Sequence, residues 1–404
     1  MAIGMRRLAV LTVLLLVVVG ITSAAYGFFP RGGFNLNQQL RYATWSFKEF
    51  DTDEDGVIEQ GEGLEFRIEG GPRGFTPDEI EHVKAGFKVW EDVPTSYVAF
   101  RYAGVIEDPI VPGLGSPDYL PQVFMQVTGI AEDDGYSQPD DIEYLVPEIT
   151  GGLLGTTLAL YAIDTTAIPV GGNTVIVPAG TILDCDIVLN AAWFRYGVLE
   201  GNTLGVLDLQ SVITKAAGSL LGLHETPLNN LDPFNTVAGL SVEPAIVQLT
   251  GTDGVARMIG ATPTMFPEYF LTQSGSGEYL SGWADLAPDD ISGISWLYPR
   301  EDGLENFCSI QQEARTQVRN ATGIPPAPIS GAHIVAWADV SDSPSGRRVP
   351  LFSTMTGLYN MYTDTQLSGQ FNLMGLWKQM EVPGKEGALF EPSYVLTMSP
   401  LNGL

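Results

Sequence analysis

The stretch from Asp208 to Pro227, DLQSVITKAAGSLLGLHETP, predicts a helix with one buried face. Asp208 is a natural N-cap residue, and Gly222 can end the helix in a left-handed turn. Lys215 and Ser219 are four residues apart, so they share a face of the helix. Apolar residues recur at helical spacing and define the buried face: Leu209, Val212, Ile213, Ala217, Leu220 and Leu221.

A second helix is predicted upstream, in FTPDEIEHVKAGFKVWEDVP at residues 75–94. Thr76 is the expected N-cap, Pro77 suits the first helical position, and Glu79 completes a capping box. Its buried face is expected to hold Ile80, Val83, Phe87 and Trp90. The helix ends at a proline, and residues 96–102, SYVAFRY, then alternate as a strand.

Strands with glycine and proline between them are expected around the two helices. They lie at residues 64–71, 157–164, 173–178 and 181–190, and a short helix follows at 287–299. Residues 104–150 are rich in proline, glycine and acidic side chains and are expected to form a loop-dominated insertion. Helices and strands in this mixture predict the α+β class.

The character of the chain changes near Arg300. Residues 300–323 are polar and are expected to be partly helical, and IPPAPISG at 324–331 is typical of a linker. Short alternating runs follow at residues 332–339, 347–354, 369–376 and 393–400. Several short strands with turns between them predict a small all-β sandwich.

The composition limits the classes of partner. The chain has 404 residues, enough for two or three domains, and its 48 acidic and 20 basic residues give a net charge of −28. Phosphate binding needs clustered lysine and arginine, so nucleic acid and anionic membrane surfaces are not expected as partners. Cations are the more natural partners, and the alternative is a charge that serves solubility.

Residues 1–25 predict a secretory signal peptide. Arg6 and Arg7 precede the apolar run LAVLTVLLLVVVGI, and the small residues TSAA end near Ala25. The alternative is an uncleaved N-terminal anchor, and no later run is long enough to span a bilayer. We therefore expect a secreted, periplasmic or cell-envelope protein that leaves the membrane once the signal is cleaved.

The chain has 2 cysteines, Cys185 and Cys308. In an exported protein they could pair as a disulfide. Cys185 also fits an apolar strand pattern, where it would be a buried thiol. The sequence leaves both possibilities open.

Residues 51–62, DTDEDGVIEQGE, match the pattern of a calcium-binding loop of the EF-hand type. Gly56 would supply the sharp turn of the loop. The expected ligands are the carboxylates of Asp51, Asp53, Asp55 and Glu62 and the backbone carbonyl of Val57, with Glu59 acting through water. The alternative is a solvated acidic turn, and one feature supports it: the residues after Glu62 predict a strand and not the second helix of an EF-hand.

The helix of the opening stretch resembles the zinc-binding helix of matrixin-type metalloproteases, within the metzincin clan. That family carries H-E-x-x-H-x-x-G-x-x-H, in which three histidines bind zinc and the glutamate is the general base. Further matches follow the family's order: residues 75–102, DCDIVLN at 184–190, TPTMFP with Met265 as the Met-turn, and LAPDDISGISWLYP at 286–299. The resemblance covers roughly residues 57–299 and implies a twisted mixed sheet with long helices.

The zinc motif is degenerate in this chain. The two helical histidines, the glutamate and the third histidine are replaced, and these positions hold Lys215, Ser219, Ala216 and Glu225, while the glycine is kept as Gly222. His224 lies one position from the third ligand, but a set of His224, Glu225 and Ser219 would bind zinc poorly because serine is rarely a ligand. The family implies zinc, and these residues predict that it does not bind.

A substitute for the metal is suggested by the charges at the two outer positions. Lys215 and Glu225 are opposite in charge, so we expect an ion pair between them to connect the helix to the following loop.

Residues 331–404 resemble the carboxypeptidase regulatory-like β-sandwich. The residues that fit its pattern are Gly369, Phe371, Leu373, Gly375 and Leu376. The stretch at 377–393 departs from it, because it expands the usual short turn before the last strand. Modules of this kind are usually accessory or adhesive.

The expected domain order follows from these matches. It is a signal peptide at 1–25, an N-terminal segment at 26–56 with the acidic loop at 51–62, a matrixin-like domain at 57–299, a linker at 300–330 and a β-sandwich at 331–404. We expect an inactive pseudo-metallopeptidase that binds a protein, cell-surface or matrix ligand. The alternative is an active zinc metalloendopeptidase with a non-standard ligand set. The chain has neither a Ser-His-Asp motif nor a phosphate-binding loop.

Overall fold

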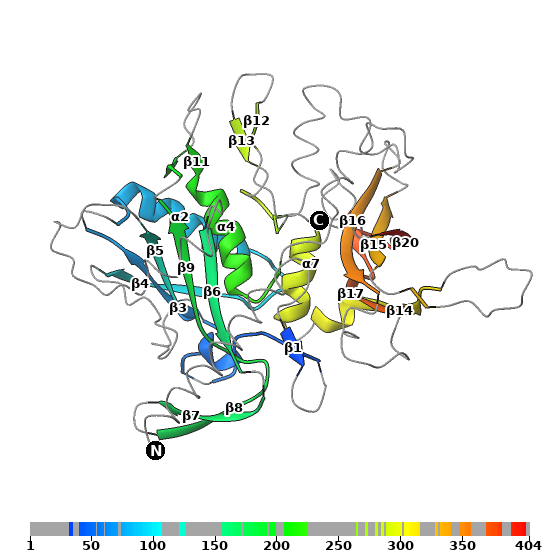
Figure 1. The fold of residues 1–404 in the computed structure, drawn as a ribbon, viewed down its shortest axis with the longest axis horizontal. Helices are drawn as coiled ribbons and strands as arrows, with labels where there is room; N and C mark the ends of the chain where they lie inside the picture. The colour runs from blue at the N-terminus through cyan, green and yellow to red at the C-terminus, as the bar shows by residue number, and fades with distance from the viewer. Residues whose placement is uncertain are drawn as a thin grey trace, which may run out of the picture. The chain divides into compact units, whose positions relative to one another are not determined.

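The protein is described by a computed structural model in separate segments. The described residues are 32–34, 40–53, 55–59, 61–71, 74–106, 121–126, 155–162, 164–170, 173–191, 194–198, 206–224, 264–265, 271–273, 279–281, 284–286, 288–300, 303–315, 328–329, 332–340, 347–356, 369–381 and 389–400. Of these, residues within 31–92 and 98–222 form one compact unit, and residues within 93–97 and 223–404 form a second. Both units combine helices with β-sheets, so the chain is an α+β protein, as predicted (Figure 1).

The first unit contains a five-stranded sheet with strand order β4-β3-β5-β9-β6. Its strands are β3 (Leu64–Glu69), β4 (Phe100–Ile106), β5 (Gln122–Gln126), β6 (Gly155–Tyr161) and β9 (Ile182–Asn190). Neighbouring strands are parallel except at the edge, where β6 pairs antiparallel with β9. The sheet is therefore mixed. The strand expected at 96–102 is displaced, because β4 begins only at Phe100.

Helix α2 (Pro77–Glu91) begins as predicted. Glu79 Oε2 accepts a hydrogen bond from the Thr76 N–H at 2.8 Å, and the Glu79 N–H donates to Thr76 Oγ1 at 3.4 Å, which confirms the capping box. The predicted apolar face is buried: Ile80, Val83, Phe87 and Trp90. The Phe87 ring stacks on Phe66 of β3 with centroids 4.2 Å apart, so this face of α2 covers the sheet.

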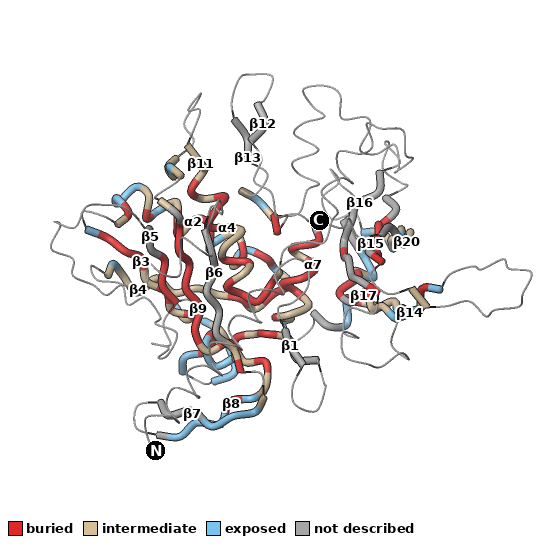
Figure 2. The backbone as a smooth tube through the Cα atoms, in the orientation of Figure 1, coloured by how far each residue is buried: buried red, intermediate tan, exposed pale blue. Residues whose placement is uncertain are grey.

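Helix α4 (Leu209–Leu220) packs against α2, β6 and β9. The Trp90 Nε1–H of α2 donates to the Thr214 carbonyl of α4 at 2.7 Å, and both groups are buried. Gly86 brings the helices close, since a Cβ there would lie 2.7 Å from Ile213 Cγ2. Figure 2 shows that β9 and α4 are buried along most of their length.

Short elements complete the first unit. Paired strands are β1 (Gly32–Phe34) with β2 (Leu40–Tyr42), β7 (Thr166–Val170) with β8 (Asn173–Val177), and β10 (Tyr196–Gly197) with β11 (Leu207–Asp208). A 3-10 helix, η1 (Phe47–Glu49), precedes the acidic loop. β11 ends at Asp208, the residue that caps α4.

Residues 43–50, which we call the N-terminal strap, run beside the start of β9. The Thr44 N–H donates to the Gly180 carbonyl at 2.9 Å, and the Thr44 carbonyl accepts from the Ile182 N–H at 2.8 Å. The strap is therefore tied to the core by backbone hydrogen bonds.

The strap also covers the C-terminal end of α4. The Trp45 Nε1–H donates to the Leu220 carbonyl at 2.9 Å, in a buried position. Gly222 adopts a φ of +88°, which confirms the predicted left-handed end of the helix. A Cβ at Gly222 would overlap the Ala43 carbonyl oxygen, so the strap requires glycine here.

The second unit contains two C-terminal sheets, β16-β15-β20 and β14-β17, in which neighbours are antiparallel. Their strands are β14 (Phe307–Glu313), β15 (Ala332–Val340), β16 (Arg347–Met355), β17 (Gln370–Trp377) and β20 (Ser393–Pro400). The last four confirm the strands expected from the alternating runs. Smaller pairs are β12 (Leu271–Gln273) with β13 (Tyr279–Ser281) and β18 (Met380–Glu381) with β19 (Leu389–Phe390).

Helix α7 (Pro288–Leu297) is the short helix expected at 287–299, and it packs against β16 and β17. The Ser292 Oγ–H donates to the Gly375 carbonyl of β17. Tyr298, just beyond the helix, is buried against Tyr97.

Residues 300 and 303–315 are the described part of the stretch 300–323 that was expected to be partly helical. A 3-10 helix, η3 (Gly303–Asn306), leads there into a strand that was not expected, β14. β14 pairs with β17, although it lies within the stretch expected to be a linker. The reason is packing, because Phe307 is buried and its ring centroid lies 4.5 Å from that of Trp377. Such tertiary contacts outweigh the preference of the polar local sequence.

The two cysteines are not joined in a disulfide. Cys185 is a buried thiol on β9, and Cys308 is half-buried on β14. Among the described residues, none forms a helix long and apolar enough to cross a membrane. The signal at 1–25, Glu225, most of 104–150 and residues 316–327 lie outside the described residues.

Candidate functional site

The helix α4 has the scaffold that its sequence predicts. Asp208 caps it, because its side chain accepts from the Ser211 N–H at 3.0 Å, and Ser211 Oγ–H donates to the same carboxylate. The predicted apolar set is buried: Leu209, Val212, Ile213, Ala217, Leu220 and Leu221. Lys215, Ala216 and Ser219 remain partly exposed on the helix.

The residues at the zinc positions do not fit zinc. Lys215 offers an ammonium group, Ala216 has no functional side chain to act as a base, and Ser219 offers a hydroxyl that rarely binds zinc. The Ala216 carbonyl accepts a hydrogen bond from Thr157 Oγ1 at 3.4 Å, which ties α4 to the edge strand β6. Glu225 lies outside the described residues, so its expected ion pair with Lys215 stays a prediction.

His82 and His224 do not replace the missing zinc ligands of α4. His82 is half-buried on α2, and His224 is half-buried two residues beyond Gly222. Within the described segments, one group of His, Cys, Asp or Glu could hold a metal with three residues, and it is Asp51, Asp53 and Asp55. The described part of the chain thus has an acidic candidate site and lacks a zinc-type donor set on α4.

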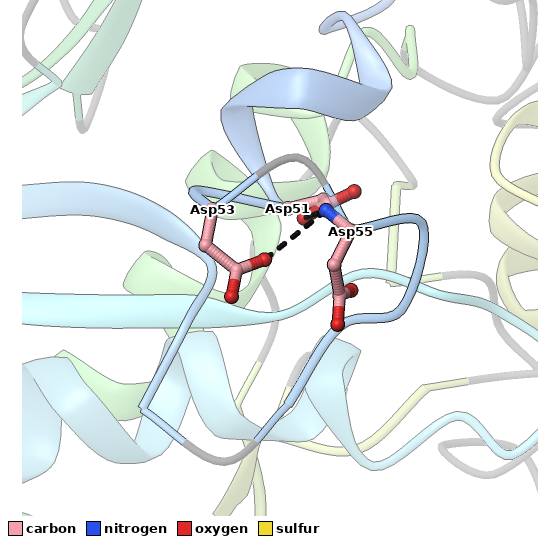
Figure 3. Close-up of side chains that lie close together, drawn as sticks. All are labelled: Asp51, Asp53 and Asp55. Carbon is pink, nitrogen blue, oxygen red and sulfur yellow. Dashed lines mark hydrogen bonds between the residues drawn. The ribbon is translucent and has the colours of Figure 1, made fainter.

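The three aspartates of the acidic loop converge, as predicted. One ligand atom from each of Asp51, Asp53 and Asp55 lies within 4.8 Å of the others (Figure 3). The Asp55 N–H is shared between Asp53 Oδ1 at 3.1 Å and Asp51 Oδ1 at 3.2 Å. Gly56 has a φ of +93°, and its N–H donates to Asp51 Oδ2 at 2.8 Å. The loop therefore has the sharp turn that the pattern requires.

Glu62 closes the loop through hydrogen bonds. Its Oε1 accepts from the Thr52 N–H at 2.9 Å, from Thr52 Oγ1 at 2.8 Å and from the Asp53 N–H at 3.2 Å. Its Oε2 accepts from the Glu59 N–H at 2.9 Å. Hydrogen bonds from the Glu59 backbone and the Thr52 side chain lower the pKa of Glu62. The sequence pattern did not reveal these hydrogen bonds. Glu62 would have to give them up to bind a metal ion through both of its oxygens.

Charge repulsion acts on Asp53. The hydrogen bond from the Asp55 N–H lowers the pKa of Asp53, but desolvation and the charges of Asp55, Glu62 and Asp51 together raise it above its ordinary value. Val57 is exposed, and its N–H donates to Asp55 Oδ1 at 2.8 Å. The loop is thus a concentrated negative site that a cation would relieve.

Met265 is buried in the second unit, in a turn with Thr264. The Thr264 N–H donates to Asp290 Oδ2 at 2.7 Å, and the Met265 N–H donates to Asp290 Oδ1 at 3.3 Å. Thr264 Oγ1 also donates to the Asp285 carbonyl at 2.7 Å. The sequence signals an acidic helix start at Asp290 but does not reveal that this residue holds the turn.

Comparison with models of known protein families gives no match for this chain, and comparison with curated proteins gives none either. The structure defines an α+β protein with a closed acidic loop and a buried helix that carries Lys215 and Ser219 where a zinc helix carries histidines. Function therefore has to be inferred from these residues.

Proposed function

We propose that the chain is an exported, matrixin-like pseudo-metallopeptidase that binds a protein, cell-surface or matrix ligand without cleaving it. The observation that carries the proposal is α4. Its cap, buried face and terminal Gly222 are built as a zinc helix would need, while Lys215, Ala216 and Ser219 replace ligands and base. A scaffold kept without its chemistry favours binding over catalysis.

The arrangement of the first unit supports this proposal. A mixed sheet with two helices packed on it agrees with the fold that the matrixin resemblance implies, and the C-terminal sheets agree with a β-sandwich. Among the described strands, β6 pairs only with β9, which leaves its other edge for an extended segment of a partner. Thr157 on that strand contacts α4 through Ala216, so the edge and the degenerate positions belong to one surface.

Zinc content and proteolysis test the proposal directly. The purified protein is expected to carry no stoichiometric zinc and to leave casein intact, because Lys215 and Ser219 cannot replace two imidazoles. The matched comparison is a variant with Lys215→His, Ala216→Glu, Ser219→His and Glu225→His, which restores the family pattern and is expected to gain zinc affinity. One zinc per wild-type chain, lost on chelation together with caseinolysis, would establish the alternative of an active peptidase.

We also propose that the acidic loop binds calcium in an exported setting. Asp51, Asp53 and Asp55 would hold the ion, with Glu62 and the Val57 carbonyl completing the site. Hard carboxylate oxygens in a sharp-turned loop support calcium over a softer metal. When bound, the ion would neutralise the repulsion at Asp53 and fasten the loop that joins the strap to β3.

Calcium titration by calorimetry should give a dissociation constant on the order of 10⁻⁴–10⁻³ M, the range of extracellular modules. Asp53→Asn is expected to weaken binding at least about tenfold, because each carboxylate supplies charge to the site. Affinity should also fall as the pH is lowered through the raised pKa of Asp53, since protons then compete with the ion. Asp78→Asn removes an exposed charge elsewhere and should change nothing. Equal affinities for both variants would disprove this site.

A further inference from the structure

Two adjacent carboxyl groups are buried in the first turn of α7. Asp289 is 4% exposed and Asp290 is 0% exposed. Buried carboxylates are costly unless they are paired or hydrogen-bonded, so each needs an explanation.

The burial of the Asp290 carboxylate is explained by its hydrogen bonds to the Thr264–Met265 turn. Its two oxygens accept the backbone N–H groups of Thr264 and Met265, at 2.7 and 3.3 Å. Hydrogen bonds of this kind favour the ionised form of a carboxyl group. Asp290 is therefore the charged member that fastens the turn to α7.

The burial of the Asp289 carboxyl group has no comparable explanation. Its Oδ1 has no hydrogen-bond partner among the described residues, although it is buried. Burial, followed by the negative charge of Asp290, raises the pKa of Asp289 well above its ordinary value. The N–H groups of Asp289 and Asp290 at the helix start act in the opposite direction, but they are outweighed.

The surroundings of the pair offer Asp289 no neutralising contact within the described side chains. α7 carries no cationic residue, and β17, which packs on it, carries no titratable one. The charged or titratable groups on the neighbouring segments are Asp285, Glu305, Arg300, Arg347, Arg348, Tyr97 and Tyr298. Arg300, the cation among those with a described side chain, donates instead to the Ser96 carbonyl at 2.9 Å.

We propose that Asp289 is a proton-operated latch: its neutral form lets Asp290 hold the Thr264–Met265 turn against α7, and its ionisation loosens this contact. The step is a simple proton loss, from the Asp289 carboxyl to solvent. A second negative charge beside Asp290 then repels the first inside a region with low dielectric. The turn is the element that can respond, because two hydrogen bonds to one carboxylate fasten it.

The sign of the pH dependence follows from the raised pKa. The folded chain retains the proton to a higher pH than the unfolded chain does, so the contribution of this group to stability is complete below the unfolded pKa. It is lost as the pH rises through the folded pKa. The latch is thus closed in acid and loosened at higher pH, opposite to an ion-paired aspartate.

Amide hydrogen exchange of peptides that contain Thr264 and Met265 tests the latch. After correction for intrinsic rates, wild-type protection should fall as the pH rises toward the folded pKa of Asp289, by about tenfold per pH unit while opening releases one proton. Asp289→Asn imitates the neutral form and should keep protection constant across this range. Asp285→Asn removes an exposed charge nearby and should retain the wild-type profile.

Two results would overturn the proposal. One is wild-type protection that does not change with pH, which needs no variant to be folded. The other is an Asp289→Asn profile that falls as steeply as the wild type, which would give Asp289 a structural role only.

Discussion

Gly222→Ala is expected to lower the free energy of unfolding by about 2–5 kcal/mol. A left-handed φ costs a residue with a Cβ about 1–2 kcal/mol, and Gly222 has a φ of +88°. The new methyl group would also overlap the Ala43 carbonyl oxygen, and displacing packed atoms costs about 1–3 kcal/mol more. The strap cannot move easily, because Thr44 is hydrogen-bonded to the backbone at the start of β9 and Trp45 is hydrogen-bonded to the end of α4.

Urea unfolding followed by tryptophan fluorescence measures this effect, and Gly56→Ala is the matched control. Gly56 has a φ of +93°, but a Cβ at this position would meet no other atom within 4 Å. Gly56→Ala should therefore lower the free energy of unfolding only by the cost of the left-handed φ, about 1–2 kcal/mol. If the two variants lose equal stability, the contact between strap and helix end contributes nothing.

Trp90→Ala is expected to cost about 3–5 kcal/mol, the usual penalty for removing a large core aromatic side chain. Trp90 is 0% exposed, and its indole N–H is bonded to the Thr214 carbonyl of α4. The substitution leaves a cavity between α2 and α4 and removes the indole donor from the buried Thr214 carbonyl.

Trp90→Phe separates the two contributions, because it fills most of the cavity and removes only the hydrogen bond. Its loss should be smaller, about 1–3 kcal/mol. Lys88→Ala on the exposed side of the same helix should stay within about 0.5 kcal/mol of wild type. A Trp90→Ala protein as stable as Lys88→Ala would contradict the packing of α2 on α4. Thermal unfolding of all three proteins provides the comparison.

Local signals predicted the elements that carry the candidate site. The capping box of α2 and the Asp208 cap of α4 involve residues three positions apart, so the sequence reveals them directly. The acidic loop is also encoded within twelve neighbouring positions. Its three aspartates converge as the spacing indicates.

Contacts between distant positions could not be predicted in the same way. Asp290 holds a turn 25 and 26 residues away in the chain, and Trp45 bonds to a carbonyl 175 residues away. β14 has a polar sequence, and its strand conformation depends on pairing with β17. Glu62 fits the ligand pattern, yet backbone N–H groups compete for the same oxygens.

The strap has a consequence for the maturation of the protein. A protease that trims the N-terminus no further than Tyr42 leaves Thr44 and Trp45 in place, and the end of α4 stays covered. After a cut between the strap and β3, the strap would no longer be covalently joined to β3. Only a few hydrogen bonds and the packing of the Trp45 indole would then hold it in place. Cleavage around the acidic loop, unlike trimming before Ala43, would therefore separate the cover of α4 from the rest of the chain, and an ion held in the loop would shield these peptide bonds.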